Sequence, residues 1–293
     1  MGRRVSLWFV ALALLGSLTA RAQSPVWAIR GAHNTVYLAE SVHLLKAGNS
    51  ALPPAFDRAY TDARVIVMEL DLSSIDSTAI QGWMLEHGTF KGDATLRATL
   101  GEQRYQRLAV ESQRLGLPVE GLEAFEPWAI ALTLTDLEYL KLGYDPEQGV
   151  EEQIQHRAIA DRKEIRGLET IEQELGQLEH LSYEQQARFL DLTLDEMHDA
   201  ESDTDELLAA WRAGDTRRLA GMLSDEYQTF PELYRALVTE RNKRWLPQIE
   251  RFLTDDRDYM VLVGALHLVG KDGLLDLLKT QGYSPTPVRS SAR

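Results

Sequence analysis

The feature that most limits the fold is residues 260–263 (MVLV), a short apolar run followed directly by Gly264. Such a run is typical of a strand that is buried on both faces, as strands are in a parallel sheet covered by helices. Two further glycines then lead into a helical apolar pattern over residues 274–278. His267 lies between the strand and the helix, where open α/β sheets bind ligands, although a hydrogen-bonded interior histidine is the alternative. The segment predicts an α/β fold.

Other predicted strands also end at a polar side chain. Residues 27–30 and 35–41 flank a turn and predict a hairpin, and its second strand leads to His43. A short strand over residues 163–168 ends at Glu169. A polar side chain at the end of a buried strand is therefore a repeated feature of this chain.

The clearest predicted strand covers residues 64–72 (RVIVMELDL). Its side chains are apolar on both faces until Glu69, and Asp71 follows two positions later. Burial of a carboxylate without a partner costs several kcal/mol. We therefore expect Glu69 to be paired, metal-bound or protonated.

The remaining periodicity predicts mostly helices, over residues 96–115, 126–137 and 150–162, with a short strand over residues 117–122. Residues 170–252 have a helical and polar pattern, with capping boxes predicted at Thr170, Ser182 and Asp203 and a C-terminal stop at Gly214. We predict one α/β domain over residues 23–286, with a central, mostly parallel sheet flanked by helices. A largely helical insertion, about residues 170–252, separates the last two core strands and covers the sheet, and residues 287–293 form a disordered tail.

The first 22 residues predict a secretory signal peptide. Arg3 and Arg4 precede the apolar residues 5–18, and Ala20-Arg21-Ala22 matches an A-x-A cleavage site. No later stretch approaches 18 consecutive apolar residues, so we expect no stable membrane span. The sequence therefore predicts an exported protein, either periplasmic or secreted.

The absence of cysteine excludes several kinds of site, and the acidic net charge argues against several kinds of partner. A chain without cysteine has no disulfides, no cysteine nucleophile and no thiolate zinc site. The formal net charge of −14 argues against nucleic acids and anionic membranes as partners. The nucleophile elbow G-x-S-x-G, the Walker loop, the H-E-x-x-H helix and the G-x-G-x-x-G fingerprint do not occur.

The residues that follow the predicted strands suggest a metal centre. His43, Glu69, Glu169 and His267 should meet, because the carboxyl ends of parallel strands share one edge of a sheet. Two imidazoles with carboxylates and no sulfur suit a divalent ion such as Mn, Co, Zn or Fe. Such an ion polarises a carbonyl and lowers the pKa of bound water, and a spare carboxylate serves as general base.

Several segments of the chain resemble the TraB/GumN family, which is related to the Tiki metalloproteases. Gly264-Ala265-Leu266-His267 resembles the C-terminal GxxH motif of that family, and the likeness spans residues 27–283. It implies an α/β fold and, for the Tiki branch, metal-dependent peptide cleavage by two histidines and a glutamate. By position these are His43, His267 and Glu69. The other similar segments are Ser41-Val42-His43-Leu44-Leu45, Pro53-Pro54, Val67-Met68-Glu69, Gly143-Tyr144-Asp145, Gly149-Val150, Gly167-Leu168-Glu169-Thr170 and Glu240-Arg241-Asn242.

The chain departs from the family pattern at Glu40, where the first motif normally begins with glycine. Either Glu40 points away from the site, or metal binding is altered or lost.

Our first hypothesis is an exported metal-dependent hydrolase that acts on peptides. In it His43 and His267 are ligands, Glu69 is a ligand or base, and Glu169 and Arg241 support the site or orient substrate. The alternative is a non-enzymatic binding protein for a peptide, a sugar or a haem or iron ligand on the same scaffold.

Overall fold

We analysed a computed structural model, which describes residues 24–71, 77–227 and 230–289. The predicted signal peptide, residues 1–22, lies outside the described residues, as do residues 290–293 of the predicted tail. Among the described helices, none has the length and apolarity needed to cross a lipid bilayer.

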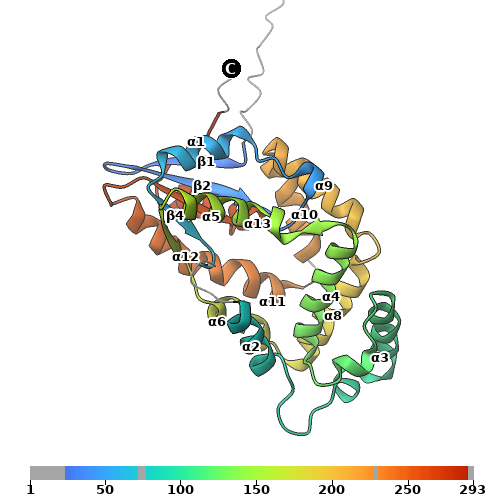
Figure 1. Cartoon of the computed structure of the whole chain (residues 1–293). Helices are drawn as coiled ribbons and strands as arrows, with labels where there is room; N and C mark the ends of the chain where they lie inside the picture. Colours follow the sequence, from blue (N-terminus) through green and yellow to red (C-terminus); the bar gives the residue numbers. More distant parts are fainter. Residues whose placement is uncertain (1–23, 72–76, 228–229, 290–293) are drawn as a thin grey trace, which may run out of the picture.

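A six-stranded sheet with the strand order β6-β4-β7-β2-β1-β8 lies in the upper part of the molecule in Figure 1. The four strands from β6 to β2 are parallel to one another, whereas β1 is antiparallel to both of its neighbours. The predicted mostly parallel sheet and the predicted hairpin are therefore confirmed. The strands are β1 (Val26–Arg30), β2 (Thr35–Ser41), β4 (Val65–Met68), β6 (Glu164–Gly167), β7 (Tyr259–Gly264) and β8 (Thr286–Pro287).

Helices cover both faces of the sheet, because the central strands are apolar on both sides. Even-numbered residues of β7, such as Met260, pack in the core with the helices of one face, whereas Val261 packs with those of the other. On the first face lie α1 (Pro54–Asp62), α5 (Val150–Ala160), α9 (Ala200–Ala213) and α10 (Thr216–Tyr227). On the second lie α12 (Glu240–Phe252) and α14 (Leu274–Thr280).

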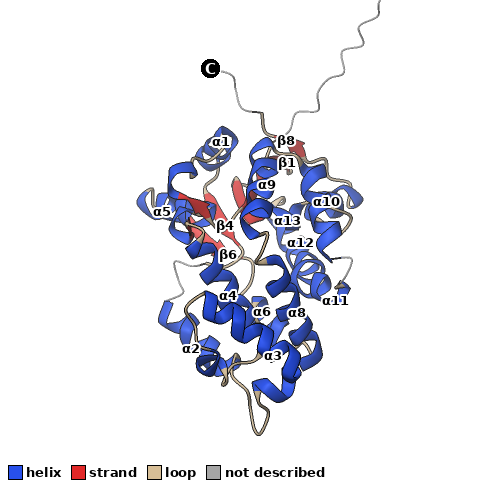
Figure 2. Cartoon of the chain, turned by 90° about the vertical axis from the view of Figure 1, so that its right-hand side faces the viewer, coloured by secondary structure: helices blue, strands red, loops and turns tan. Residues whose placement is uncertain are grey.

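A second group of helices lies beyond the end of the sheet (Figure 2). It has its own apolar cluster, which α3, α4 and α8 share. These helices come from both sides of β6 in the sequence, so the segment 170–252 is not one insertion lying on the sheet: α8 belongs to this group, and α9, α10 and α12 return to the sheet. The group comprises α2 (Ser77–His87), α3 (Leu96–Arg114), α4 (Pro127–Lys141), α6 (Ile171–Glu174), α7 (Gly176–Glu179) and α8 (Tyr183–Glu196).

Short elements complete the described chain. A two-stranded ribbon pairs β3 (Leu45–Lys46) with β5 (Tyr144–Asp145), and α11 (Pro231–Tyr234) leads through a π-helical turn into α12. The turn α13 (Ala265–Leu268) follows β7, and 3₁₀ turns cover Ala47–Asn49, Val119–Leu122 and Pro146–Gln148.

Three local predictions were wrong and three were right. Residues 119–122 form a 3₁₀ turn after Pro118 and not a strand, and Asp203 lies inside α9 and caps no helix. The predicted tail starts too early, since the backbone N–H of Val288 donates to Val26 O at 2.8 Å and the Val288 side chain is buried. The capping boxes at Thr170 and Ser182 are present, and Gly214 ends α9 in the left-handed conformation.

Candidate metal centre

The four parallel strands bring the predicted site residues to one edge of the sheet. Glu169, Glu69 and His267 follow the adjacent strands β6, β4 and β7, and His43 follows β2. Gly264 lies among three of them, Glu69, His267 and His43. A Cβ atom built on it would lie 3.4 Å from Glu69 Oε1, 3.6 Å from His267 Cδ2 and 3.9 Å from His43 Nε2. The predicted convergence of these side chains is therefore observed, and a glycine leaves the space that they share.

Asn242 fixes the orientation of His267. Its Oδ1 lies 2.8 Å from His267 Nδ1, while its Nδ2 donates to the backbone oxygens of His267 (3.0 Å) and Asp272 (2.9 Å). Because the amide nitrogen is used for these carbonyls, its oxygen accepts from Nδ1–H, and the lone pair is left on Nε2. Burial, helped by the nearby Arg241 charge, lowers the pKa of His267 to about 3 despite Glu69. The imidazole is neutral, and its Nε2 lies 4.0 Å from Glu69 Oε1.

His43 is held by an ion pair with Glu151 and, unlike His267, is protonated, so an ion would have to displace the proton on its Nε2. Its Nδ1 lies 2.9 Å from Glu151 Oε1, and its exposed ring (67 %) lines the cleft described below. The Glu151 carboxylate raises the pKa of His43. The start of α5 makes this contact possible: Val150 N donates to Val42 O at 3.0 Å, and a Cβ on Gly149 would lie only 2.2 Å from the His43 carbonyl oxygen. The glycine before α5 therefore lets the first turn of the helix approach the end of β2.

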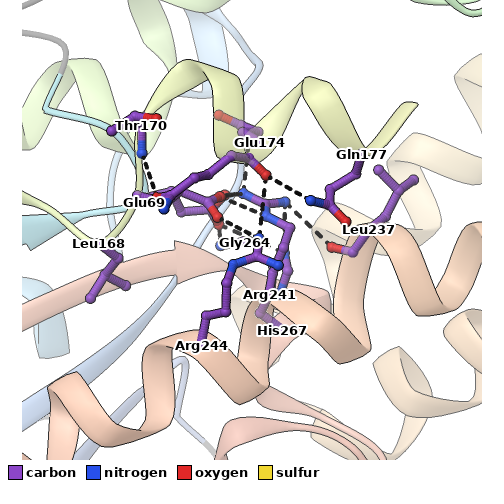
Figure 3. A network of polar contacts seen from close by, with 12 residues as sticks. Glu69, Leu168, Thr170, Glu174, Gln177, Leu237, Arg241, Arg244, Gly264 and His267 are labelled. Atoms are coloured by element: carbon purple, nitrogen blue, oxygen red, sulfur yellow. Dashed lines mark hydrogen bonds and ion pairs between the residues drawn. The ribbon is translucent and has the colours of Figure 1, made fainter. Parts of the chain in front are cut away.

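Arg241 of α12 lies at the centre of a buried ionic network (Figure 3). Its Nη2 is 2.5 Å from Glu69 Oε2, 2.6 Å from Glu169 Oε1 and 3.3 Å from Glu174 Oε1. Its Nη1 lies 3.2 Å from His267 Nε2. Oxygens of the three carboxylates all lie within 4.8 Å of one another, close enough to hold a cation, and the guanidinium takes that role here. The predicted supporting residues, Glu169 and Arg241, are thus part of the site.

The network sets the charge of its carboxylates. Burial alone would raise the pKa of Glu69, but the Arg241 guanidinium lowers it well below its usual range, so Glu69 is ionised. Glu69 Oε1 also accepts the backbone N–H of Gly264 at 2.6 Å. Burial raises the pKa of Glu174 to about 7 in spite of Arg241, and the Glu69 and Glu169 charges add to the rise. Glu69 is thus a paired buried carboxylate, as expected, whereas Arg241 only partly offsets the effect of burial on Glu174.

A cleft of about 210 Å³ opens beside these residues. His43 and Glu69 line it, whereas the buried His267 does not. The remaining lining residues are Met68, Leu70, Pro146, Glu151, Glu152 and Glu174.

The donor set fits a divalent ion in type. Among the described residues, however, the group whose ligand atoms all lie within 4.8 Å of one another is Glu69, Glu169 and Glu174, and it does not include His43 or His267. Zinc bonds to imidazole and carboxylate are about 2.0–2.2 Å long, so two ligand atoms of one ion lie at most about 4 Å apart. The separation of 4.0 Å between His267 Nε2 and Glu69 Oε1 is at that limit, which corresponds to a nearly linear arrangement around the ion. The ligand side chains would therefore have to move closer together to hold a tetrahedral zinc ion. The contact between Arg241 Nη1 and His267 Nε2 would have to open for an ion to bind.

Glu40, the departure from the first motif, points away from the cleft. Its side chain is fully buried, on the sheet face that Val36 and Leu38 share with α12 and α14, and it does not line the cleft. Its backbone oxygen accepts from the indole N–H of Trp211 at 2.8 Å. Burial raises the pKa of its carboxyl to about 8, although the Trp27 indole lowers it. Glu40 is thus a protonated core residue, which leaves the space around His43 unchanged.

Sequence reasoning missed Asn242, Glu151 and Glu174 as members of the site. Asn242 had a signal, since it directly follows Arg241 in a segment already singled out. Glu151 and Glu174 lie in acidic helical segments, where a carboxylate is ordinarily exposed to solvent, and only their contacts with His43 and Arg241 set them apart.

A family model and two similar proteins each match this chain over most of its length. A model of the TraB/PrgY/gumN family matches residues 25–287. Proteins called uncharacterized protein YbaP, from Escherichia coli (strain K12) and from Shigella flexneri, are each 25% identical over 243 residues. The matched region covers 83% of this chain and 87% of each relative. No solved structure matches the chain.

Proposed function

Because the chain belongs to the TraB/PrgY/gumN family, we propose that it is an exported metal-dependent hydrolase that cleaves peptides. His43 and His267 would hold a divalent ion such as Mn, Co, Zn or Fe, together with Glu69. The predicted leader segment supports export, and the family resemblance to peptide-cleaving relatives supports the choice of substrate.

One observation carries this proposal. Both imidazoles have a polar partner near Nδ1: a hydrogen bond to Asn242 Oδ1 at 2.8 Å for His267, and an ion pair with Glu151 Oε1 at 2.9 Å for His43. His267 Nε2 lies 4.0 Å from Glu69 Oε1, and His43 Nε2 lies on the Gly264 side of the same carboxylate. Metal-bound histidines almost always have this second partner, which fixes the ring and raises its basicity as a ligand. A bound ion would supply Lewis acidity at that point.

The residues of the chain then have separate roles. Glu69 is the ligand or the general base that takes a proton from water, since it is the carboxylate that faces both imidazoles. Arg241 neutralises Glu69 and Glu169 and presents N–H donors at the same edge. It would orient a substrate carbonyl or carboxylate, as guanidinium groups do.

Metal analysis tests the proposal directly. Purified protein, refilled with Mn, Co or Zn after chelation, should contain close to one ion per chain, and His267→Ala should lose it. Cleavage of a peptide library should stop on chelation and return on refilling. Wild-type protein that remains metal-free after refilling would overturn the assignment.

A second candidate is a non-enzymatic binding protein on the same scaffold. The position of Arg241 favours it, because the guanidinium already fills the space among Glu69, Glu169 and Glu174 and contacts His267. A site balanced by a protein cation can bind a ligand without any ion. Tight peptide binding that survives chelation, without turnover, would favour this candidate over the hydrolase.

A further inference from the structure

We propose that the cleft beside His43 binds the side chain of a lysine or arginine in the peptide substrate. This inference rests on the proposed function, to which it adds a substrate class.

The cleft has about the size of one side chain, and one wall is apolar while the other is acidic. Its volume of about 210 Å³ is below the roughly 300–1,000 Å³ of pockets that enclose a drug-sized ligand, so it suits a single side chain. Met68, Leu70 and Pro146 form an apolar lining, and the glutamates form an acidic one. Lysine and arginine match this combination, because an apolar stem carries a charged end.

The charge balance around the cleft also favours a basic side chain. Four carboxylates line it: Glu69, Glu151, Glu152 and Glu174. Among the described residues, the basic side chains within 4 Å of them are Arg241, His43, His156 and His267, of which His267 is neutral. His156 is 3.7 Å from Glu152 and its side chain is 61 % exposed, so its attraction is screened by water. In the metal-free chain the lining is therefore acidic overall, which favours a cationic group over a neutral or anionic one.

The position of the cleft connects this preference with the proposed chemistry. His43 and Glu69 belong to both the candidate metal centre and the cleft wall. Glu152 lies in the first turn of α5, next to the Glu151 that orients His43. A basic side chain in the cleft would thus place its own backbone beside the His43 imidazole.

Binding of matched peptides tests the inference without relying on turnover. The probes are capped pentapeptides Ala-Ala-X-Ala-Ala with Lys, Gln or Glu at the central position, titrated into full-length protein in the presence of chelator. We expect the Lys peptide to bind about fivefold more tightly than the Gln peptide, and the Glu peptide to bind most weakly. The difference should shrink as salt is added. Equal affinity for the three peptides, or preference for Glu, would overturn the inference.

Charge reversal at Glu152 tests whether the preference for the Lys peptide arises in the cleft. Glu152→Lys should abolish or invert the Lys-over-Glu preference, and Glu152→Gln, which keeps the size of the side chain, should reduce it. Glu120→Lys is the matched control, because Glu120 is exposed on a 3₁₀ turn, does not line the cleft, and undergoes the same change in net charge. If Glu120→Lys shifts the preference as much as Glu152→Lys does, the cleft is not the binding site.

The two proposals fail separately. Chelator-sensitive cleavage without preference for a basic residue would leave the hydrolase standing and remove the cleft assignment. Selective binding of the Lys peptide by a chain that holds no metal would keep the cleft assignment and remove the metal-dependent hydrolase.

Discussion

Asn242 Oδ1 lies 2.8 Å from Nδ1 of His267, and the Asn242 amide nitrogen donates to the backbone oxygen of the same histidine at 3.0 Å. The asparagine therefore sets both the position of the turn after β7 and the tautomer of its imidazole. The two residues are 25 positions apart in sequence and come from different elements, α12 and α13.

Asn242→Ala should weaken divalent-ion binding by about 10–100-fold, as loss of an outer-shell partner of a ligating histidine usually does. The ring would lose the acceptor that keeps the proton on Nδ1. Titration calorimetry with Mn and Zn measures the change. His267→Ala is the reference and should lose binding completely; affinity unchanged in Asn242→Ala would show that Asn242 has only a structural role.

Glu151→Gln should also reduce ion affinity, and by a smaller factor than His43→Ala. The amide retains an acceptor for His43 Nδ1–H but loses the negative charge that raises the basicity of the ring. The same calorimetric titration applies. Glu152→Gln, the adjacent change on α5, is the control and should leave the dissociation constant of the ion within about twofold. Equal losses in the two variants would mean that the charge acts at long range and not through His43.

Arg241→Met should lower the free energy of unfolding by about 3–5 kcal/mol, since it leaves buried carboxylates without their counter-charge. The side chains of Arg241 and Glu69 are each less than a tenth exposed. Arg244→Met, at a side chain 35 % exposed with one carboxylate partner, is the control and should cost about 1 kcal/mol or less. Denaturant unfolding compares the variants.

A divalent ion should stabilise Arg241→Met more than it stabilises the wild type. Without the guanidinium, oxygens of Glu69, Glu169 and Glu174 remain within 4.8 Å of one another and are available to a cation. The shift of the thermal midpoint on addition of Mn measures this effect. An equal shift in both proteins would show that Arg241 does not compete for the site.

The sequence predicted the sheet and the meeting of its strand ends for a physical reason. Apolar runs buried on both faces require a covered parallel sheet, and parallel strands place His43, Glu69, Glu169 and His267 on one edge whatever their separation in sequence. Arg241 was also predicted, on condition that its helix packs over the site, and α12 does so.

What the sequence did not predict depends on packing between helices. The pairing of His43 with Glu151 needs the close approach of α5 at Gly149, and no periodicity encodes that distance. The division of residues 170–252 between the sheet and the separate helical group likewise depends on contacts of α8 with α3 and α4, which come from an earlier part of the chain. The strand predicted over residues 117–122 failed because Pro118 and Gly121 shape a tight turn.

Glu40 should make the stability of the protein depend on pH in an unusual direction. Burial raises the pKa of its carboxyl from 4.5 to about 8, so the native state keeps a proton that the unfolded state releases near pH 4.5. Between these values the native state binds more protons, and raising the pH therefore lowers the free energy of unfolding. Glu40 changes the free energy of unfolding by at most about 1.4 kcal/mol per pH unit. This dependence vanishes below pH 4.5 and above pH 8, where the folded and unfolded states carry the same charge at this position.

Glu40→Gln isolates this effect, because glutamine has nearly the same shape and does not titrate. The difference in unfolding free energy, variant minus wild type, should grow in favour of the variant from about pH 5 to about pH 8. Urea unfolding at several pH values measures it, and Glu120→Gln, at an exposed position, should show no such trend. A constant difference between Glu40→Gln and the wild type would mean that Glu40 is ionised in the folded protein. The residue in the glycine position of the first motif would then be a charged part of the core, and the separation of Glu40 from the chemistry of His43 would no longer hold.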